Sequence, residues 1–143
     1  MSEQNKDICR RAVEEFINQK KLELSDQIYH PDFRLIDPDH PEGMDLTIYL
    51  ESRKTLFTSF PDFHAKIVDM ITKGETVALV WRAQGTFKAD WGDLPANNKL
   101  ISWYGVDVNK FQDGKIVECL TAFDNLGPAM EMGWVQTAVP AVE

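Results

Sequence analysis

Two stretches of the chain place apolar residues at helical spacing. They predict an amphipathic helix over residues 5–20 and a second helix over residues 46–60, which Pro61 ends. A shorter helical piece is expected over residues 24–29, and another over residues 127–132. The positions that follow this spacing are Ile8, Ala12, Val13, Phe16 and Ile17 in the first helix, and Leu46, Tyr49, Leu50, Arg53, Leu56, Phe57 and Phe60 in the second.

The remaining pattern is typical of strands. Runs rich in β-branched and aromatic residues predict strands over residues 33–37, 63–72, 76–87, 99–111 and 115–124. Residues 37–43 (DPDHPEG) favour turns and predict an exposed loop. Helices followed by consecutive strands predict an α+β fold, in which a curved, mostly antiparallel sheet wraps around the N-terminal helices to form a cone with an internal pocket. We expect a single domain over residues 1–143, with residues 136–143 as a loose tail.

The last two strands are joined by a tight turn at Asp113 and Gly114. The register of this hairpin decides which side chains share a face. A three-residue loop, which we favour, pairs Asp107 with Cys119, whereas a two-residue loop pairs Asp107 with Leu120. In the first register one face carries Trp103, Asp107, Cys119, Thr121 and Phe123, and the opposite face of the sheet carries Val80, Tyr104, Val106, Val108, Ile116 and Leu120. So much apolar surface on a second face predicts a homodimer.

Charge and composition exclude several classes of function. The formal net charge of −8 argues against a nucleic-acid partner and against an anionic membrane surface. We expect no membrane span, no signal peptide and a cytoplasmic location, because the chain lacks a long apolar run. Cys9 and Cys119 lie far apart without a CxxC motif, and the three histidines lack ligand spacing, so we expect neither a disulfide nor a metal site.

Several short motifs occur together in a characteristic order. They are residues 29–33 (YHPDF), 37–38 (DP), 60–62 (FPD), 81–85 (WRAQG), 105–107 (GVD), 113–118 (DGKIVE), 124–127 (DNLG) and 132–133 (MG). In these motifs the chain resembles the SnoaL-like polyketide cyclase family, whose cone-shaped α+β fold is shared with nuclear transport factor two and ketosteroid isomerase. The resemblance covers nearly the whole chain.

This resemblance implies an intramolecular aldol ring closure on a polyketide ester, without a metal or cofactor. The family's acid/base aspartate on the last strand corresponds to Thr121 here, and its frequent histidine two residues earlier corresponds to Cys119. Many relatives carry an aspartate where Asp107 stands. Because threonine does not ionise near neutral pH, the mechanism must differ in this chain.

Asp107 is the leading candidate for the base, because a carboxylate in mid-strand is disfavoured by strand propensity and, if it faces inward, by desolvation. Thr121 would orient a substrate carbonyl. Asp124 is either a helix cap or a second cavity carboxylate, and His40 and Asp37 are either an acid/base group at the cavity mouth or solvated loop residues. Candidate residues for contact with a small apolar or aromatic ligand are Trp81, Trp103, Phe123 and Tyr49, with Cys119 as a small buried group.

Two other functions remain open. One is a noncatalytic ligand-binding or dimerisation module, which Thr121 and Cys119 at the family's ionisable positions would suit. The other is epoxide hydrolysis, which needs two aspartates and an inward-pointing arginine around a water. Arg53 or Arg82 would have to supply that arginine, and strand alternation puts Arg82 on the face opposite Trp81.

Overall fold

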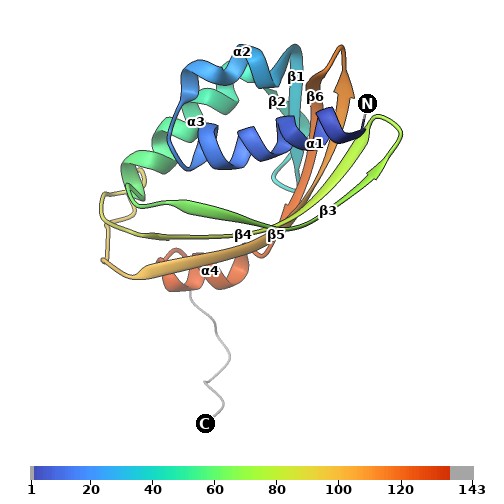
Figure 1. Ribbon diagram of the computed structural model, residues 1–143. Helices are drawn as coiled ribbons and strands as arrows, with labels where there is room; N and C mark the ends of the chain where they lie inside the picture. Colours follow the sequence, from blue (N-terminus) through green and yellow to red (C-terminus); the bar gives the residue numbers. More distant parts are fainter. Residues whose placement is uncertain (1, 136–143) are drawn as a thin grey trace.

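The computed structural model describes residues 2–135 as helices packed against one curved sheet (Figure 1). The chain begins with helix α1 (Ser2–Arg11), which continues into the π-helical segment η1 (Ala12–Ile17), the 3-10 turn η2 (Leu22–Leu24) and the short helix α2 (Ser25–Ile28). Strands β1 (Tyr29–Asp37) and β2 (His40–Asp45) precede helix α3 (Leu46–Ser59). Strands β3 (His64–Lys73), β4 (Thr76–Thr86), β5 (Leu100–Gln112) and β6 (Lys115–Phe123) follow, and helix α4 (Leu126–Glu131) is last. The predicted tail, residues 136–143, lies outside the described residues.

The strands form one six-stranded sheet in the order β2-β1-β6-β5-β4-β3. All neighbouring pairs are antiparallel except β1 with β6, which is parallel. Helices α1, α2 and α3 lie together on one side of the curved sheet (Figure 1). The predicted α+β fold, with helices on the inner face of a mostly antiparallel sheet, is therefore confirmed. None of the helices among the described residues is long and apolar enough to cross a membrane.

The prediction of an exposed loop over residues 37–43 is wrong in part. Residues from His40 onward form strand β2, which pairs with β1 through Arg34 and Asp45, Leu35 and Met44, and Asp37 and His40. Because β2 is the edge of the sheet, Pro41 can lie in it without removing a hydrogen bond that an inner strand would need. The loop therefore shrinks to a short turn after Asp37.

The hairpin of β5 and β6 has a register that differs from both predicted ones. Asp113 and Gly114 both have positive φ, so they form a two-residue turn, and Gln112 pairs with Lys115. A register shift between Lys110 and Phe111 then moves the pairing by one residue, and Asp107 pairs with Thr121. Because of this bulge, the residues beyond it face the same side of the sheet as they would in the predicted three-residue register. The side chains of Trp103, Asp107, Cys119, Thr121 and Phe123 therefore face the same cavity, as expected for the first register.

The same irregularity corrects one prediction about the outer face. Ile116 was expected there but is buried and lies on the inner side, because it precedes the shift in register. Tyr104, Val106 and Leu120 are exposed on the outer face, as predicted. The core consists of two buried clusters between the helices and the inner face. The larger contains Phe16, Tyr29, Phe33 and Tyr49, and the smaller contains Phe60, Phe87, Ile101 and Met132.

Candidate functional site

A cavity of about 380 Å³ lies between α3 and the inner face of the sheet. This volume is within the range of roughly 300–1,000 Å³ typical of ligand pockets. Its wall is mostly aromatic and aliphatic, with few polar side chains. The aromatic lining includes Tyr29, Phe33, Tyr49, Phe60, Phe63, Trp81, Trp91, Trp103 and Phe123, and the polar side chains include Asp37, His40, Ser52, Arg53, Asp107, Asn109 and Thr121.

Asp107 lies in the middle of β5, partly buried, and its carboxylate accepts a hydrogen bond from the indole N–H of Trp81 at 3.0 Å. Trp81 can reach it because the residue beside Trp81 on β5 is Gly105. A Cβ at Gly105 would lie 2.6 Å from Trp81 Cζ2 and 2.7 Å from Phe123 Cβ. The glycine is therefore needed so that the indole can pack across the strand and donate to Asp107.

Burial in this apolar wall raises the pKa of the Asp107 carboxyl above its ordinary value. Interactions with the Thr121 hydroxyl, the Trp81 indole and the positive charge of Arg53 act in the other direction, but desolvation is the largest effect. Thr121 stands directly opposite Asp107 in the sheet and is buried. Asp107 therefore combines a raised pKa with fixed hydrogen-bonding partners, which are the properties of a poised general base.

Two cysteine thiols lie in the same wall. Cys9 comes from α1 and Cys119 from β6, and both are buried and free. Burial raises the pKa of the Cys9 thiol to about 12, with a further contribution from the negative charge of Asp107. Burial and Asp107 likewise raise the pKa of Cys119 well above its ordinary value. Both groups are therefore neutral thiols at neutral pH rather than nucleophiles.

A pair of tyrosines forms the wall nearest the helices. The hydroxyl oxygens of Tyr29 and Tyr49 are 3.3 Å apart, and the two rings pack edge to face at 5.4 Å. Desolvation raises the pKa of both phenols. They are neutral hydrogen-bonding groups inside the cavity, able to donate to an oxygen of a bound molecule.

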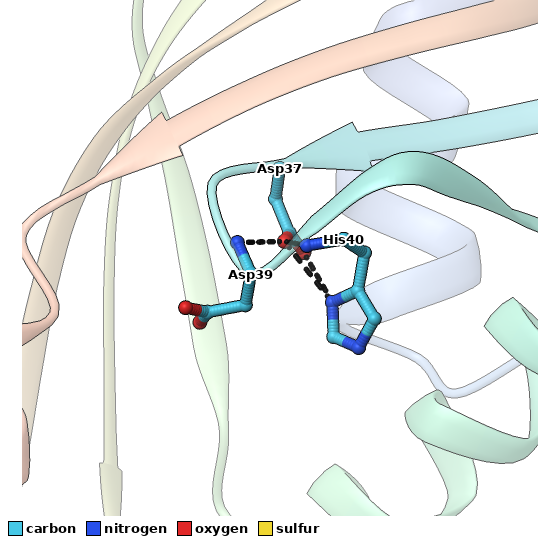
Figure 2. Close-up of polar contacts among 3 residues, drawn as sticks. All are labelled: Asp37, Asp39 and His40. Atoms are coloured by element: carbon cyan, nitrogen blue, oxygen red, sulfur yellow. Dashed lines mark hydrogen bonds and ion pairs between the residues drawn. The ribbon is translucent and has the colours of Figure 1, made fainter.

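At the turn between β1 and β2, Asp37 and His40 form a hydrogen-bonded pair (Figure 2). The Asp37 carboxylate accepts from the backbone N–H of Asp39 at 2.8 Å and of His40 at 2.7 Å, and His40 Nδ1 lies 3.0 Å from the same oxygen. Because a carboxylate only accepts, Nδ1 carries the hydrogen and Nε2 is left as the basic nitrogen of the neutral ring. Both residues line the cavity while the His40 side chain is half exposed, so the pair stands at the cavity mouth.

Not every predicted site residue reaches the cavity. The Asp124 side chain is exposed at the end of β6 and accepts a hydrogen bond from the Gly127 N–H at 3.3 Å. It is absent from the cavity lining among the described residues, so its geometry is that of a helix cap rather than of a second cavity carboxylate. Trp103 packs on Phe60 at 5.0 Å, and Trp81 on Phe123 at 6.1 Å, so these aromatic residues serve as core and cavity wall at once.

The two arginines considered for epoxide chemistry lie on opposite sides of the sheet. Arg82 is exposed and stacks on the outer-face ring of Tyr104, with the guanidinium carbon 5.1 Å from the ring centre. Arg53 lines the cavity from α3, with its guanidinium carbon 4.9 Å from the centre of the Tyr49 ring. Among residues 2–135, no group of three or more histidine, cysteine, aspartate or glutamate side chains is placed to hold a metal ion.

Several polar residues of the cavity were not predicted as its site residues, among them Tyr29, Asn109 and Arg53, the last considered only for epoxide hydrolysis. Tyr29 belongs to the YHPDF motif, and Asn109 follows Asp107 on the same face, so motif and strand alternation could have indicated both. Arg53 interrupts the apolar positions of the second predicted helix, and a cation at such a position is the signal that could have found it. These signals are present in the sequence, but only the cavity shows that the three side chains lie together in it.

A family model described as SnoaL-like polyketide cyclase matches residues 7–131 of this chain. A proposed polyketide cyclase from Acidithiobacillus ferrooxidans has a similar structure, with 26% identity and a TM-score of 0.80, and the match covers 91% of this chain and 94% of the other. IdmH, a proposed polyketide cyclase from Streptomyces antibioticus, is 25% identical with a TM-score of 0.79, over 91% of this chain and 99% of IdmH.

AclR, a proposed hydroxylase from Streptomyces galilaeus, is 20% identical with a TM-score of 0.83, over 96% of this chain and 89% of AclR. At that identity the likeness shows the fold alone. No curated protein matches the chain in sequence.

Proposed function

The chain belongs to the SnoaL-like polyketide cyclase family, and from that membership we propose that it is a cofactor-free cyclase or isomerase. Its substrate would be a polyketide-like or aromatic carbonyl compound, and its first step the removal of a proton from a carbon next to the carbonyl. The observation that carries the proposal is the Asp107 carboxylate, held by Trp81 in an apolar cavity that raises its pKa.

In the proposed reaction the Asp107 carboxylate takes the proton and the C–H electron pair becomes an enolate. In a cyclisation, the enolate carbon attacks a second carbonyl of the same molecule and forms a carbon–carbon bond. The resulting alkoxide takes the proton back from the Asp107 carboxylic acid. In an isomerisation, the proton returns to a different carbon. Thr121 donates to the Asp107 carboxylate, so it would turn its hydroxyl hydrogen to the substrate oxygen once Asp107 has taken the proton. In the Tyr29–Tyr49 pair one hydroxyl donates to the other, and the remaining phenol hydrogen offers a further donor.

The pair at the cavity mouth would assist. Nε2 of His40 would move protons between the cavity and solvent, with Asp37 orienting the ring through Nδ1. Asp124 has no part in this proposal, because its carboxylate caps the start of α4.

The test is exchange of carbon-bound hydrogen for deuterium, followed by NMR with 2-tetralone and ethyl 3-oxo-3-phenylpropanoate in deuterated buffer. We expect the protein to accelerate exchange above the buffer rate and Asp107→Asn to reduce that acceleration by about 100-fold or more. Asp69→Asn, an exposed carboxylate on β3, is the matched control and should leave the rate unchanged. Equal rates for the protein and for Asp107→Asn would remove Asp107 from the mechanism.

A noncatalytic binding module of the same fold is the second candidate. The observation that favours it is the pair of groups at the family's ionisable positions, because Thr121 is a buried hydroxyl and Cys119 a neutral thiol. A small molecule that copurifies with the protein, is released chemically unchanged and exchanges none of its acidic hydrogens would favour this candidate. Epoxide hydrolysis ranks third, because it requires a second aspartate close to Asp107.

We also propose that the protein is a homodimer that associates through the outer face of the sheet. Tyr104, Val106 and Leu120 leave an exposed apolar surface there, which a second copy would cover. The cytoplasmic location stays a prediction, which fractionation of the producing cells would test.

A further inference from the structure

Arg53 is a cation in the inward-facing row of α3. Tyr49 and Leu56 lie on the same side of this helix, four residues before and three residues after Arg53, and Phe60 follows directly after its end. All four side chains line the cavity. A charged side chain at such a position loses hydration, so it needs either a partner within the protein or a role in binding.

The described part of the chain provides no hydrogen-bonding partner for Arg53. Its Nε is buried and makes no hydrogen bond, and no carboxylate among residues 2–135 forms an ion pair with it. Two other arginines form ion pairs, Arg10 with Asp7 and Arg11 with Glu15. Among residues 2–135, the face of the Tyr49 ring is the contact that orients the Arg53 guanidinium, and it leaves the N–H groups at the guanidinium edge unused.

The charge of Arg53 reaches the base across the cavity. It lowers the pKa values of Asp107, Tyr49, Tyr29 and Cys119, although in each case desolvation is the larger effect. Arg53 and Asp107 are thus opposite charges in one apolar cavity without a direct ion pair. A ligand that lies between them can present an anionic group to Arg53 and a carbon-bound proton to Asp107.

We propose that Arg53 is the anchor for a carboxylate group of the ligand, so that the substrate class is aromatic or apolar carboxylic acids. A guanidinium offers paired N–H groups in the geometry of a carboxylate, and in an apolar cavity such charge-assisted hydrogen bonds are strong. The aromatic wall would hold the rest of the molecule. The assignment deepens the proposed function, but binding of the carboxylate does not require that any reaction takes place.

The experiment compares 1-naphthoate with 1-naphthamide, which has nearly the same shape but no charge, by isothermal titration calorimetry. We expect the wild-type protein to bind the carboxylate more tightly than the amide. Arg53→Met should weaken binding of the carboxylate by about 10- to 100-fold and leave the amide unchanged. Arg53→Lys keeps the charge without the paired N–H groups and should give an intermediate loss.

Arg82→Gln is the matched control, because it removes an arginine from the outer face of the sheet, away from the cavity, and it should change neither affinity. Arg53→Met is expected to fold, since methionine continues the apolar row of α3, and circular dichroism would verify this. Should it not fold, Arg53→Lys carries the comparison. The proposal is overturned by equal binding of the two probes to wild type, by failure of 1-naphthoate to bind at millimolar concentration, or by an affinity that Arg53 variants do not alter.

Asp107→Asn separates this proposal from the proposed function. It removes the negative charge that opposes a carboxylate in the cavity, so it should bind 1-naphthoate at least as tightly as wild type while it loses deuterium exchange. Absence of exchange in every variant together with Arg53-dependent binding would contradict the reaction and support the anchor. Exchange that requires Asp107 but does not depend on Arg53, with no preference for the carboxylate probe, would support the reaction and contradict the anchor.

Discussion

The two faces of the β4–β5–β6 sheet are made by alternate residues of the same strands, yet they differ in chemistry. On the inner face Trp81, Asp107 and Thr121 form a hydrogen-bonded group in an apolar cavity. On the outer face Arg82 stacks on Tyr104, and both remain in contact with solvent. A carboxylate or an arginine therefore acquires special properties from the face it occupies rather than from its own chemistry.

The helices create this difference. Because α1 and α3 cover one side of the sheet, water is removed from side chains on that side only (Figure 1). Arg53 and Arg82 illustrate the result, since one has a buried Nε without a partner and the other is exposed. Substitutions at neighbouring positions on opposite faces should thus have unequal effects.

The largest effect on stability is expected for Gly105→Ala. The added Cβ would lie 2.6 Å from Trp81 Cζ2 and 2.8 Å from the backbone oxygen of Ala122, and the backbone cannot move freely within the sheet. We expect a loss of about 2–3 kcal/mol in the free energy of unfolding, measured with urea. Val106→Ala, next along the strand but on the outer face, should cost less than about 1 kcal/mol. Equal losses would show that the packing around Trp81 is less constrained than described.

Asp107→Asn should change the free energy of unfolding by less than Gly105→Ala does, and it should raise that free energy rather than lower it. In the folded protein burial raises the pKa of Asp107, so folding favours the protonated acid. As the pH rises from the ordinary carboxyl pKa of about 3.9 through the folded value, the unfolded state ionises first and the folded state loses stability. Asparagine removes this loss and can still accept from Trp81. The variant should therefore be more stable than wild type at pH 7, with the gain disappearing below about pH 4.

Urea unfolding at a series of pH values measures this gain. Asp69→Asn on the exposed side of β3 serves as the control, and its stability should run parallel to wild type. A variant that is less stable than wild type at pH 7 would mean that the charged carboxylate is stabilised by its partners more than burial penalises it.

The smallest effect on the fold itself is expected on the outer face. Leu120→Glu replaces an exposed side chain and should change the stability of each subunit by no more than about 0.5 kcal/mol. If the outer face is the dimer interface, the added charges should convert a dimer to a monomer in light scattering after size exclusion. Ile48→Glu on the exposed side of α3 is the control and should keep the dimer mass. A monomeric wild-type protein at micromolar concentration would exclude the proposed interface.

The sequence correctly predicted those helices and strands in which the apolar spacing extends over many residues. The second helix and the long strands follow from the spacing of apolar residues. The face shared by Asp107, Thr121 and Cys119 was predicted from the favoured hairpin register and is produced by a bulge instead. The edge strand β2 was missed, because a segment with Pro41 and Gly43 carries the signals of a loop, and pairing with β1 outweighs them. The hairpin register was missed because local turn preferences do not reveal a bulge further along the strand.

The candidate site was predictable in part. Asp107 was identified because a carboxylate in mid-strand is unusual, and His40 because it lies in the turn-rich segment 37–43 at a strand end. Asp124 was also predicted, but the sequence does not show that its side chain faces solvent. Arg53 was visible as a position in the helical pattern, but only the cavity shows that its Nε is buried without a partner.

The sequence by itself determined the order of the helices and strands, and with them the α+β fold, because short-range periodicity is a property of the chain alone. It favoured a common face for Asp107 and Thr121 through the three-residue loop, but the bulge beside Phe111 is what places them there. The tertiary structure decided the electrostatics of that face. Burial raises the pKa of Asp107, and Gly105 allows Trp81 to reach it, through contacts between strands and helices that no local pattern records.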